Sequence, residues 1–149
     1  MQTFYAIHNR YFLPNRYYKI YKIDNDLYFG KMAGMFYQET IYSSSLIAMA
    51  ILSILDKLLF RPRAKRKEKQ LDQLIQLPTS FLEHRHNFKL SLTDDVTSVL
   101  FRHVDADATL FIKSNVRDEI EFALDGSFEV EEITKVFQPI EIKYRNYYW

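Results

Sequence analysis

The chain has 149 residues, which is the size of one domain and enough to bury a hydrophobic core. It contains no cysteine, so disulfides, thiolate nucleophiles and zinc-thiolate sites are excluded. The net charge is +1, but Arg61 to Lys69 holds six cations and one anion, while from Ser91 onward acidic residues outnumber Lys and Arg by twelve to six. This acidic half argues against a nucleic-acid partner lying across it.

The first 37 residues predict strands. Thr3 to His8 and Tyr17 to Ile23 are rich in aromatic and β-branched residues, which favour strands. Asp24-Asn25-Asp26 is typical of a turn, because these side chains tolerate left-handed backbone and bond to nearby amides. We therefore expect a hairpin, with Leu27 to Tyr37 as its return strand and Gly30 and Gly34 marking a bulge, a bend or a close backbone approach.

Residues 43–77 predict an insertion of two helices. Ile41 to Leu55 has no charged residue and is apolar on every helical face from Leu46 onward, so this helix must be hidden on all sides. It falls short of the roughly 20 apolar residues of a membrane span, which favours burial in the core or in an oligomer over interfacial insertion or a true span. Arg61-Pro62 predicts a break or a sharp kink, followed by a second helix that stops at Pro78.

The apolar helix offers more than the one stripe that a sheet can cover. We therefore expect it to pair with its copy in a symmetric homodimer. The residues assigned to self-association are Ile47, Met49, Ile51, Leu52, Leu55 and Leu59. We also expect a row of residues to be buried, against the sheet or against a second copy, because exposing five aliphatic side chains is unfavourable: Ile47, Ile51, Ile54, Leu55 and Leu58.

The second helix carries a run of cations that we call the basic belt. It consists of Arg61, Arg63, Lys65, Arg66, Lys67 and Lys69. Such a belt attracts anionic lipid headgroups, and it directly follows an apolar helix, as the positive-inside rule describes for a cytoplasmic membrane end. The basic belt is therefore predicted to bind an anionic surface.

Residues 87–145 predict further strands and a closing helix. Apolar and polar residues alternate in four rows, which predicts strands with one dry face and successive antiparallel neighbours. The inward residues are Phe88, Leu90, Leu92, Val99, Phe101, His103, Leu110, Ile112, Ile120, Phe122 and Leu124. A helix with Ser127 as N-cap and Ile133 and Phe137 on one face should end at Pro139, before one more strand and the aromatic tail 146–149.

The order of these segments resembles a known family. The stretches Phe88-Lys-Leu-Ser-Leu, Val99-Leu-Phe-Arg, Thr109-Leu-Phe-Ile-Lys, Glu119-Ile-Glu-Phe-Ala-Leu and Glu131-Glu-Ile-Thr-Lys-Val-Phe are similar to the later strands and closing helix of bacterial pleckstrin-homology-like (PH-like) domains. The resemblance implies a bent antiparallel sheet or partial barrel capped by a helix, often in proteins that work at membranes. The helical insertion and the last strand depart from that pattern. We expect one α+β domain spanning residues 1–149.

No motif predicts catalysis, a cofactor or a metal. His84 and His86 lack a third ligand, and the glycines are too scattered to cradle a phosphate. We expect a non-enzymatic binding or scaffolding domain that associates with an anionic membrane surface through the basic belt and self-associates through the apolar helix. The alternative is a soluble regulator or inhibitor that binds a protein partner through its acidic sheet face and aromatic tail. The N-terminus lacks the order of a signal peptide, so we expect a cytoplasmic protein, peripheral to the membrane if the belt binds lipid.

Overall fold

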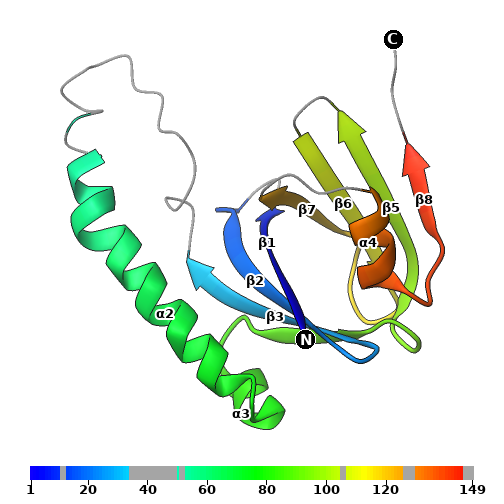
Figure 1. Cartoon of the computed structure of the whole chain (residues 1–149), viewed down its shortest axis with the longest axis horizontal. Helices are drawn as coiled ribbons and strands as arrows, with labels where there is room; N and C mark the ends of the chain where they lie inside the picture. Colours follow the sequence, from blue (N-terminus) through cyan, green and yellow to red (C-terminus); the bar gives the residue numbers. More distant parts are fainter. Residues whose placement is uncertain (11–12, 34–49, 51–52, 105–106, 126–129, 146–149) are drawn as a thin grey trace.

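The computed structural model describes residues 1–10, 13–33, 50, 53–104, 107–125 and 130–145. In these ranges, eight strands form one open, mostly antiparallel sheet in the order β4-β3-β2-β1-β7-β6-β5-β8 (Figure 1). The α+β class and the antiparallel sheet are confirmed. The strands are β1 (Gln2–Asn9), β2 (Arg16–Ile23), β3 (Asp26–Ala33), β4 (Phe88–Ser91), β5 (Val96–Val104), β6 (Asp107–Ser114), β7 (Ile120–Asp125) and β8 (Ile142–Arg145). The helical elements are η1 (Asp56–Phe60), α2 (Arg61–Leu74), α3 (Pro78–Glu83) and α4 (Val130–Phe137).

The predicted N-terminal hairpin is confirmed, with β1, β2 and β3 as consecutive antiparallel neighbours. Asp24 in its turn has φ 50°, the left-handed backbone that aspartate tolerates better than most residues. The return strand ends at Ala33, and the remainder of its predicted span lies outside the described residues.

The chain turns sharply between β4 and β5. These strands were predicted to be antiparallel neighbours, and that prediction is wrong, because β4 pairs with β3 and β5 pairs with β6 and β8. Residues 92–95 form a turn instead, in which the Asp95 amide donates to the Ser91 carbonyl over 3.0 Å, and the Leu92 amide donates to the distant Asn25 carbonyl over 2.7 Å. The chain therefore passes from one edge of the sheet almost to the other in four residues, which requires the sheet to curve round its core.

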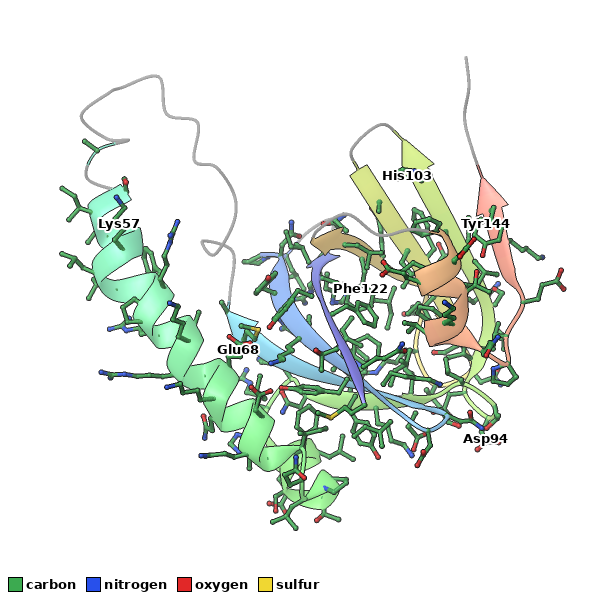
Figure 2. All side chains as sticks on the ribbon, viewed as in Figure 1. Lys57, Glu68, Asp94, His103, Phe122 and Tyr144 are labelled. Carbon is green, nitrogen blue, oxygen red and sulfur yellow. The ribbon has the colours of Figure 1, made fainter. Side chains whose placement is uncertain are left out.

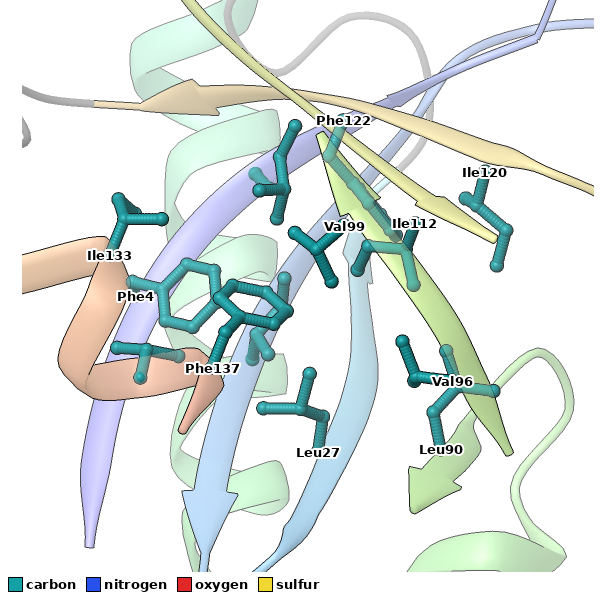
Figure 3. Close-up of a cluster of buried hydrophobic side chains, with 14 of the residues drawn as sticks. Phe4, Leu27, Leu90, Val96, Val99, Ile112, Ile120, Phe122, Ile133 and Phe137 are labelled. Atoms are coloured by element: carbon teal, nitrogen blue, oxygen red, sulfur yellow. The ribbon is translucent and has the colours of Figure 1, made fainter. Parts of the chain in front are cut away.

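The main core lies on the concave face of the sheet. Ile133 and Phe137 of α4 are fully buried and lie beside Phe4 of β1 (Figure 3). The predicted inward rows are confirmed for every strand from β4 to β7 in most positions; the exceptions are Leu124, which is half-buried, and His103, which is exposed because its strand ends at the rim of the sheet. The helix α4 thus covers one end of this core.

A second core lies on the outer face of β2 and β3, under α2 and α3. Its buried members are Tyr17, Tyr21, Tyr28, Met32, Leu71, Ile75 and Phe81. Gly30 lets this layer approach β3, since a Cβ there would lie 3.0 Å from both Leu71 methyl groups and 3.1 Å from Phe81 Cζ. The close approach predicted for Gly30 is confirmed.

The helical insertion differs from the prediction in two places. Residues 53–74 form one continuous helix through Arg61-Pro62, so the predicted break there is wrong (Figure 1). The π-helical turn η1 widens the helix just before Pro62, which accommodates a residue that lacks an amide and crowds the preceding turn. Pro78 does not only stop a helix, because it also begins α3. The expected start at Ser43 to Ser45 lies outside the described residues.

The last predicted strand is confirmed as β8. It pairs in parallel with β5, with Ile142 opposite Val99. A parallel neighbour requires a crossover, which α4 supplies, so the closing helix and the final strand form one unit at this edge of the sheet.

Candidate functional site

The basic belt lies on the outer side of α2. Its members Arg61, Arg63, Lys65, Arg66 and Lys69 are exposed, while Lys67 is half-buried and donates to the Gln70 side chain over 3.2 Å. The opposite side of α2 carries Ala64, Glu68 and Leu71 toward the sheet, at the spacing of one helical face (Figure 2). The structure therefore displays the belt to solvent.

A polar cluster fastens α2 to the sheet. Lys19, on the outer face of β2, is 6% exposed, and its Nζ lies 2.9 Å from Glu68 Oε1 and 2.8 Å from Asp72 Oδ1. Tyr5 and Tyr21 donate hydrogen bonds to the same two carboxylates. Burial alone would lower the pKa of Lys19, but the bonds with Asp72 and Glu68 outweigh it and raise that pKa. We call these five residues the helix clamp.

The residues assigned to self-association lie mostly beyond the described part of the chain, which excludes Ile47, Met49, Ile51 and Leu52. Leu55 is half-buried and Leu59 is 41% exposed. The row predicted to be buried includes Ile54 and Leu58. The prediction that they are buried against the sheet is wrong, because their side chains are 55% and 68% exposed. The reason is that Leu71, Ile75 and Phe81 already fill the outer face of the sheet.

No helix among the described residues is long and apolar enough to cross a membrane. This finding concerns residues 53–74 in particular, because they form the longest helix of the described ranges. The first part of that helix still carries exposed leucine and isoleucine side chains next to the basic belt.

A pocket of about 520 Å³ opens where β1 ends and β2 begins. It is built from distant parts of the sequence: β1, β2, the connection from α3 into β4, and the connection between β6 and β7. The lining residues are His8, Arg16, Tyr18, His86, Asn87, Phe88, Arg117, Asp118, Glu119 and Ile120.

The walls of this pocket are held in place. The Arg117 guanidinium lies 4.1 Å from the centroid of the Phe88 ring, a cation–π contact that orients it. Asn87 donates to the Phe81 carbonyl over 2.9 Å and accepts from the Lys31 amide over 3.0 Å. These bonds hold the loop at His86, whose backbone is left-handed with φ 75°. Such a conformation persists only where surrounding contacts maintain it.

Two arginines and two carboxylates line the pocket, and further cations act on its histidine. The pKa of His8 is lowered to about 4, first by burial and then by Arg10, Arg16 and Arg117. Its Nδ1 atom is buried and has no hydrogen-bond partner within the described part of the protein. At neutral pH this imidazole is therefore uncharged, and one of its polar atoms is unsatisfied.

The cationic surface continues from the pocket toward α2. Burial and the charges of Arg16, Arg85, Arg10 and Lys67 lower the pKa of Lys31. We call Arg10, Arg16, Lys31, Arg85 and Arg117 the pocket cations. None of them forms an ion pair with a carboxylate in the described ranges, and Asp118 and Glu119 at the lining are exposed. Lys67 links this group to the basic belt.

Sequence reasoning missed this pocket. Of the three cations on β2, only Arg16 lines the pocket, while Lys19 lies in the helix clamp and Lys22 donates to the Gln138 carbonyl. The pair His84 and His86 drew notice as metal ligands, yet no three metal-binding side chains gather among the described residues. No linear signal marks the site, because its members come from segments more than 100 residues apart.

The chain was compared with protein-family models, curated proteins and solved structures. No family model, curated protein or solved structure matches it. Its function is therefore inferred from the pocket, the basic belt and the helix that carries the belt.

Proposed function

We propose that this protein is a non-enzymatic binding module for a phosphate-bearing anion, with the pocket as its recognition site. The observation that carries the proposal is the pair Arg16 and Arg117, which line the pocket from separate segments and form no ion pair in the described ranges. Like charges held close together repel each other and raise the free energy of the protein. A bound anion would offset this repulsion.

Phosphate suits this set better than a simple halide. Arginine presents several N–H donors in a planar fork that matches two oxygens of a phosphate group, and Arg16 and Arg117 both line the pocket. The His8 imidazole lines the same pocket and can supply a ring N–H donor to a further oxygen. The aromatic rings of Tyr18 and Phe88 leave room beside the anion for an apolar or planar group.

The resemblance to bacterial PH-like domains supports a binding role. The strand order around β1 and the packing of α4 on the core are compatible with a bent sheet capped by a helix. The two departures from that family lie outside this unit, since α2 and α3 cover the outer face and β8 adds to an edge. The pocket proposal itself rests on its residues and not on the family.

The phosphate group could belong to a membrane lipid or to a soluble molecule. The basic belt lies beside the pocket cations, which supports association with an anionic surface and a peripheral membrane location. The alternative of a soluble regulator that binds a protein partner stays a prediction, because the aromatic tail lies outside the described residues.

The first test is titration of the full chain with inorganic phosphate, followed by NMR of its backbone amides. We expect saturable shifts at residues around the pocket, and an affinity about tenfold or more weaker in the variant R16Q/R117Q, because each charged hydrogen bond lost is worth about 1.5–3 kcal/mol. The matched control R63Q/K69Q removes the same charge from the basic belt and should bind phosphate like the wild type. Shifts of equal size in both variants would contradict a site in the pocket.

Two further measurements refine the result. Sulfate keeps its charge across the pH range, and its binding should raise the pKa of His8 from about 4, because a nearby anion favours the imidazolium. Vesicles of phosphatidylglycerol in phosphatidylcholine then separate the two sources of phosphate. If R16Q/R117Q weakens phosphate binding but not vesicle binding, the pocket serves a soluble ligand.

A further inference from the structure

We infer that the first part of the long helix, residues 53–66, docks on an anionic lipid bilayer by inserting its apolar side chains between the headgroups. We call this segment the helix arm. The inference goes beyond the proposed function, because none of its residues lines the pocket. We assign the exposed apolar side chains of the arm to a bilayer because of the charges beside them.

The helix arm projects from the body of the protein. Ala64 is the first described side chain of the arm that is buried, with an exposed fraction of 3%. The contacts with the helix clamp begin only at Glu68. Figures 1 and 2 show the same arrangement: the lower part of α2 lies along the sheet, while Lys57 sits near the far end of the helix. The arm therefore belongs to a helix whose other half packs on the outer face of the sheet.

Three large apolar side chains are exposed within six residues of this arm. Ile54 is 55% exposed, Leu58 is 68% exposed and Leu59 is 41% exposed. Ile54 and Leu58 are four residues apart and lie on the same side of the helix, and Leu59 lies next to Leu58 in the wider π-helical turn η1, so together they form a patch and not scattered positions. Patches of this kind mark surfaces that bind a partner or a membrane.

Cations follow this patch on the same helix. From Asp56 to Lys69 the sequence has seven cations and two acids, Asp56 and Glu68, and Glu68 is held inward by Lys19. When leucine side chains enter a bilayer surface, lysine and arginine beside them lie at the level of the phosphates. An anionic bilayer therefore satisfies both the apolar patch and the charge.

A second copy of the chain satisfies the apolar patch less well. Leu59 is followed by Arg61, and the helix continues without a break, so a copy that covers Leu59 also approaches the cations that follow. Two such arms would bring like charges together, because each arm carries five cations and only one acid, Asp56. Lipid phosphates carry the opposite charge, which favours the membrane.

The experiment is flotation of the full chain with vesicles of phosphatidylglycerol in phosphatidylcholine, compared with phosphatidylcholine alone. We expect binding only to the anionic vesicles, weakening as salt is added. The variant I54S/L58S/L59S should lose this binding at least tenfold. Its matched control is L77S/L82S, which removes two exposed leucines at the other end of the helical insertion, 64% and 40% exposed, and should bind like the wild type.

Charge and insertion are tested separately. R63Q/K65Q/R66Q should weaken vesicle binding about 100-fold, because each basic residue near an anionic surface contributes about fivefold. In a W149F background, L58W should show a blue-shifted emission on vesicles if the patch enters the bilayer. R16Q/R117Q leaves the arm intact, so vesicle binding that survives this change but not the arm variants separates the arm from the pocket.

Two outcomes would overturn the inference. One is vesicle binding that does not respond to the arm variants. The other is an arm variant that converts a dimer to a monomer in sedimentation while vesicle binding stays unchanged, which would assign the patch to a second copy.

Discussion

At the scale of single residues, Gly30 shows how one position sets the distance between two layers. It lies on β3 against Leu71 and Phe81, both of which are fully buried. Gly30→Ala should destabilise the fold by about 1–3 kcal/mol, because neither neighbour can move to make room for the added methyl group. Chemical denaturation measures the change.

The control for Gly30→Ala is a double-mutant cycle with Leu71→Ala. The smaller side chain at position 71 opens the space that the methyl group needs, so the two changes together should cost less than their sum. Additive effects, or a neutral Gly30→Ala, would show that the layer does not press on β3.

At the scale of elements, the helix clamp decides whether α2 stays on the sheet. Lys19→Met keeps the bulk of the side chain but leaves Glu68 and Asp72 without their cation, and both carboxylates are partly exposed, at 27% and 45%. We expect a loss of about 1–3 kcal/mol in the free energy of unfolding, less than for a fully buried pair. Lys89→Met, which breaks the more exposed pair with Asp26, is the control and should cost less than about 1 kcal/mol.

The pH dependence of the clamp has a definite sign. Hydrogen bonding to Tyr5 and then to Lys19 lowers the pKa of Glu68 from its ordinary value of 4.5. Its contribution to stability is therefore complete above pH 4.5 and is lost as the pH falls through the lowered pKa. Lys19→Met should be less sensitive than the wild type in this acid range. Equal sensitivity would mean that Lys19 adds nothing to the stability that Glu68 contributes.

At the scale of the whole molecule, self-association stays a prediction. Four of the six residues assigned to it, Ile47, Met49, Ile51 and Leu52, precede the helix arm, while Leu55 and Leu59 lie within it. We expect the first four to carry most of the contact. We expect sedimentation of the wild type at micromolar concentrations to give a dimer and Ile51→Lys to give a monomer, because a buried lysine without a partner is strongly unfavourable. I54S/L58S/L59S should remain a dimer. A wild type that is monomeric at every concentration would rule this out.

The sequence by itself determined the local elements of this protein. Aromatic and β-branched residues predicted β1 and β2, and alternation of apolar and polar residues predicted β4 to β7, because a strand with a dry and a wet face must carry that pattern. Pro139 and the apolar face of Ile133 and Phe137 predicted α4. Gly30 predicted a bulge, a bend or a close backbone approach. The basic belt was also visible in the sequence, since it is a continuous run.

Only the tertiary structure decided which elements meet. β4 pairs with β3 and not with β5, because the sheet curves round its core and β4 lies at its edge beside β3. The general preference of strands for their sequence neighbours does not predict this pairing. The helix continues through Pro62, because the π-helical turn η1 before it accommodates the proline ring and the missing amide. Ile54 and Leu58 stay exposed, because other side chains had already filled the face available to them. The pocket lay beyond sequence reasoning for the same reason: Arg16, His86 and Arg117 become neighbours only when the sheet has brought its loops together.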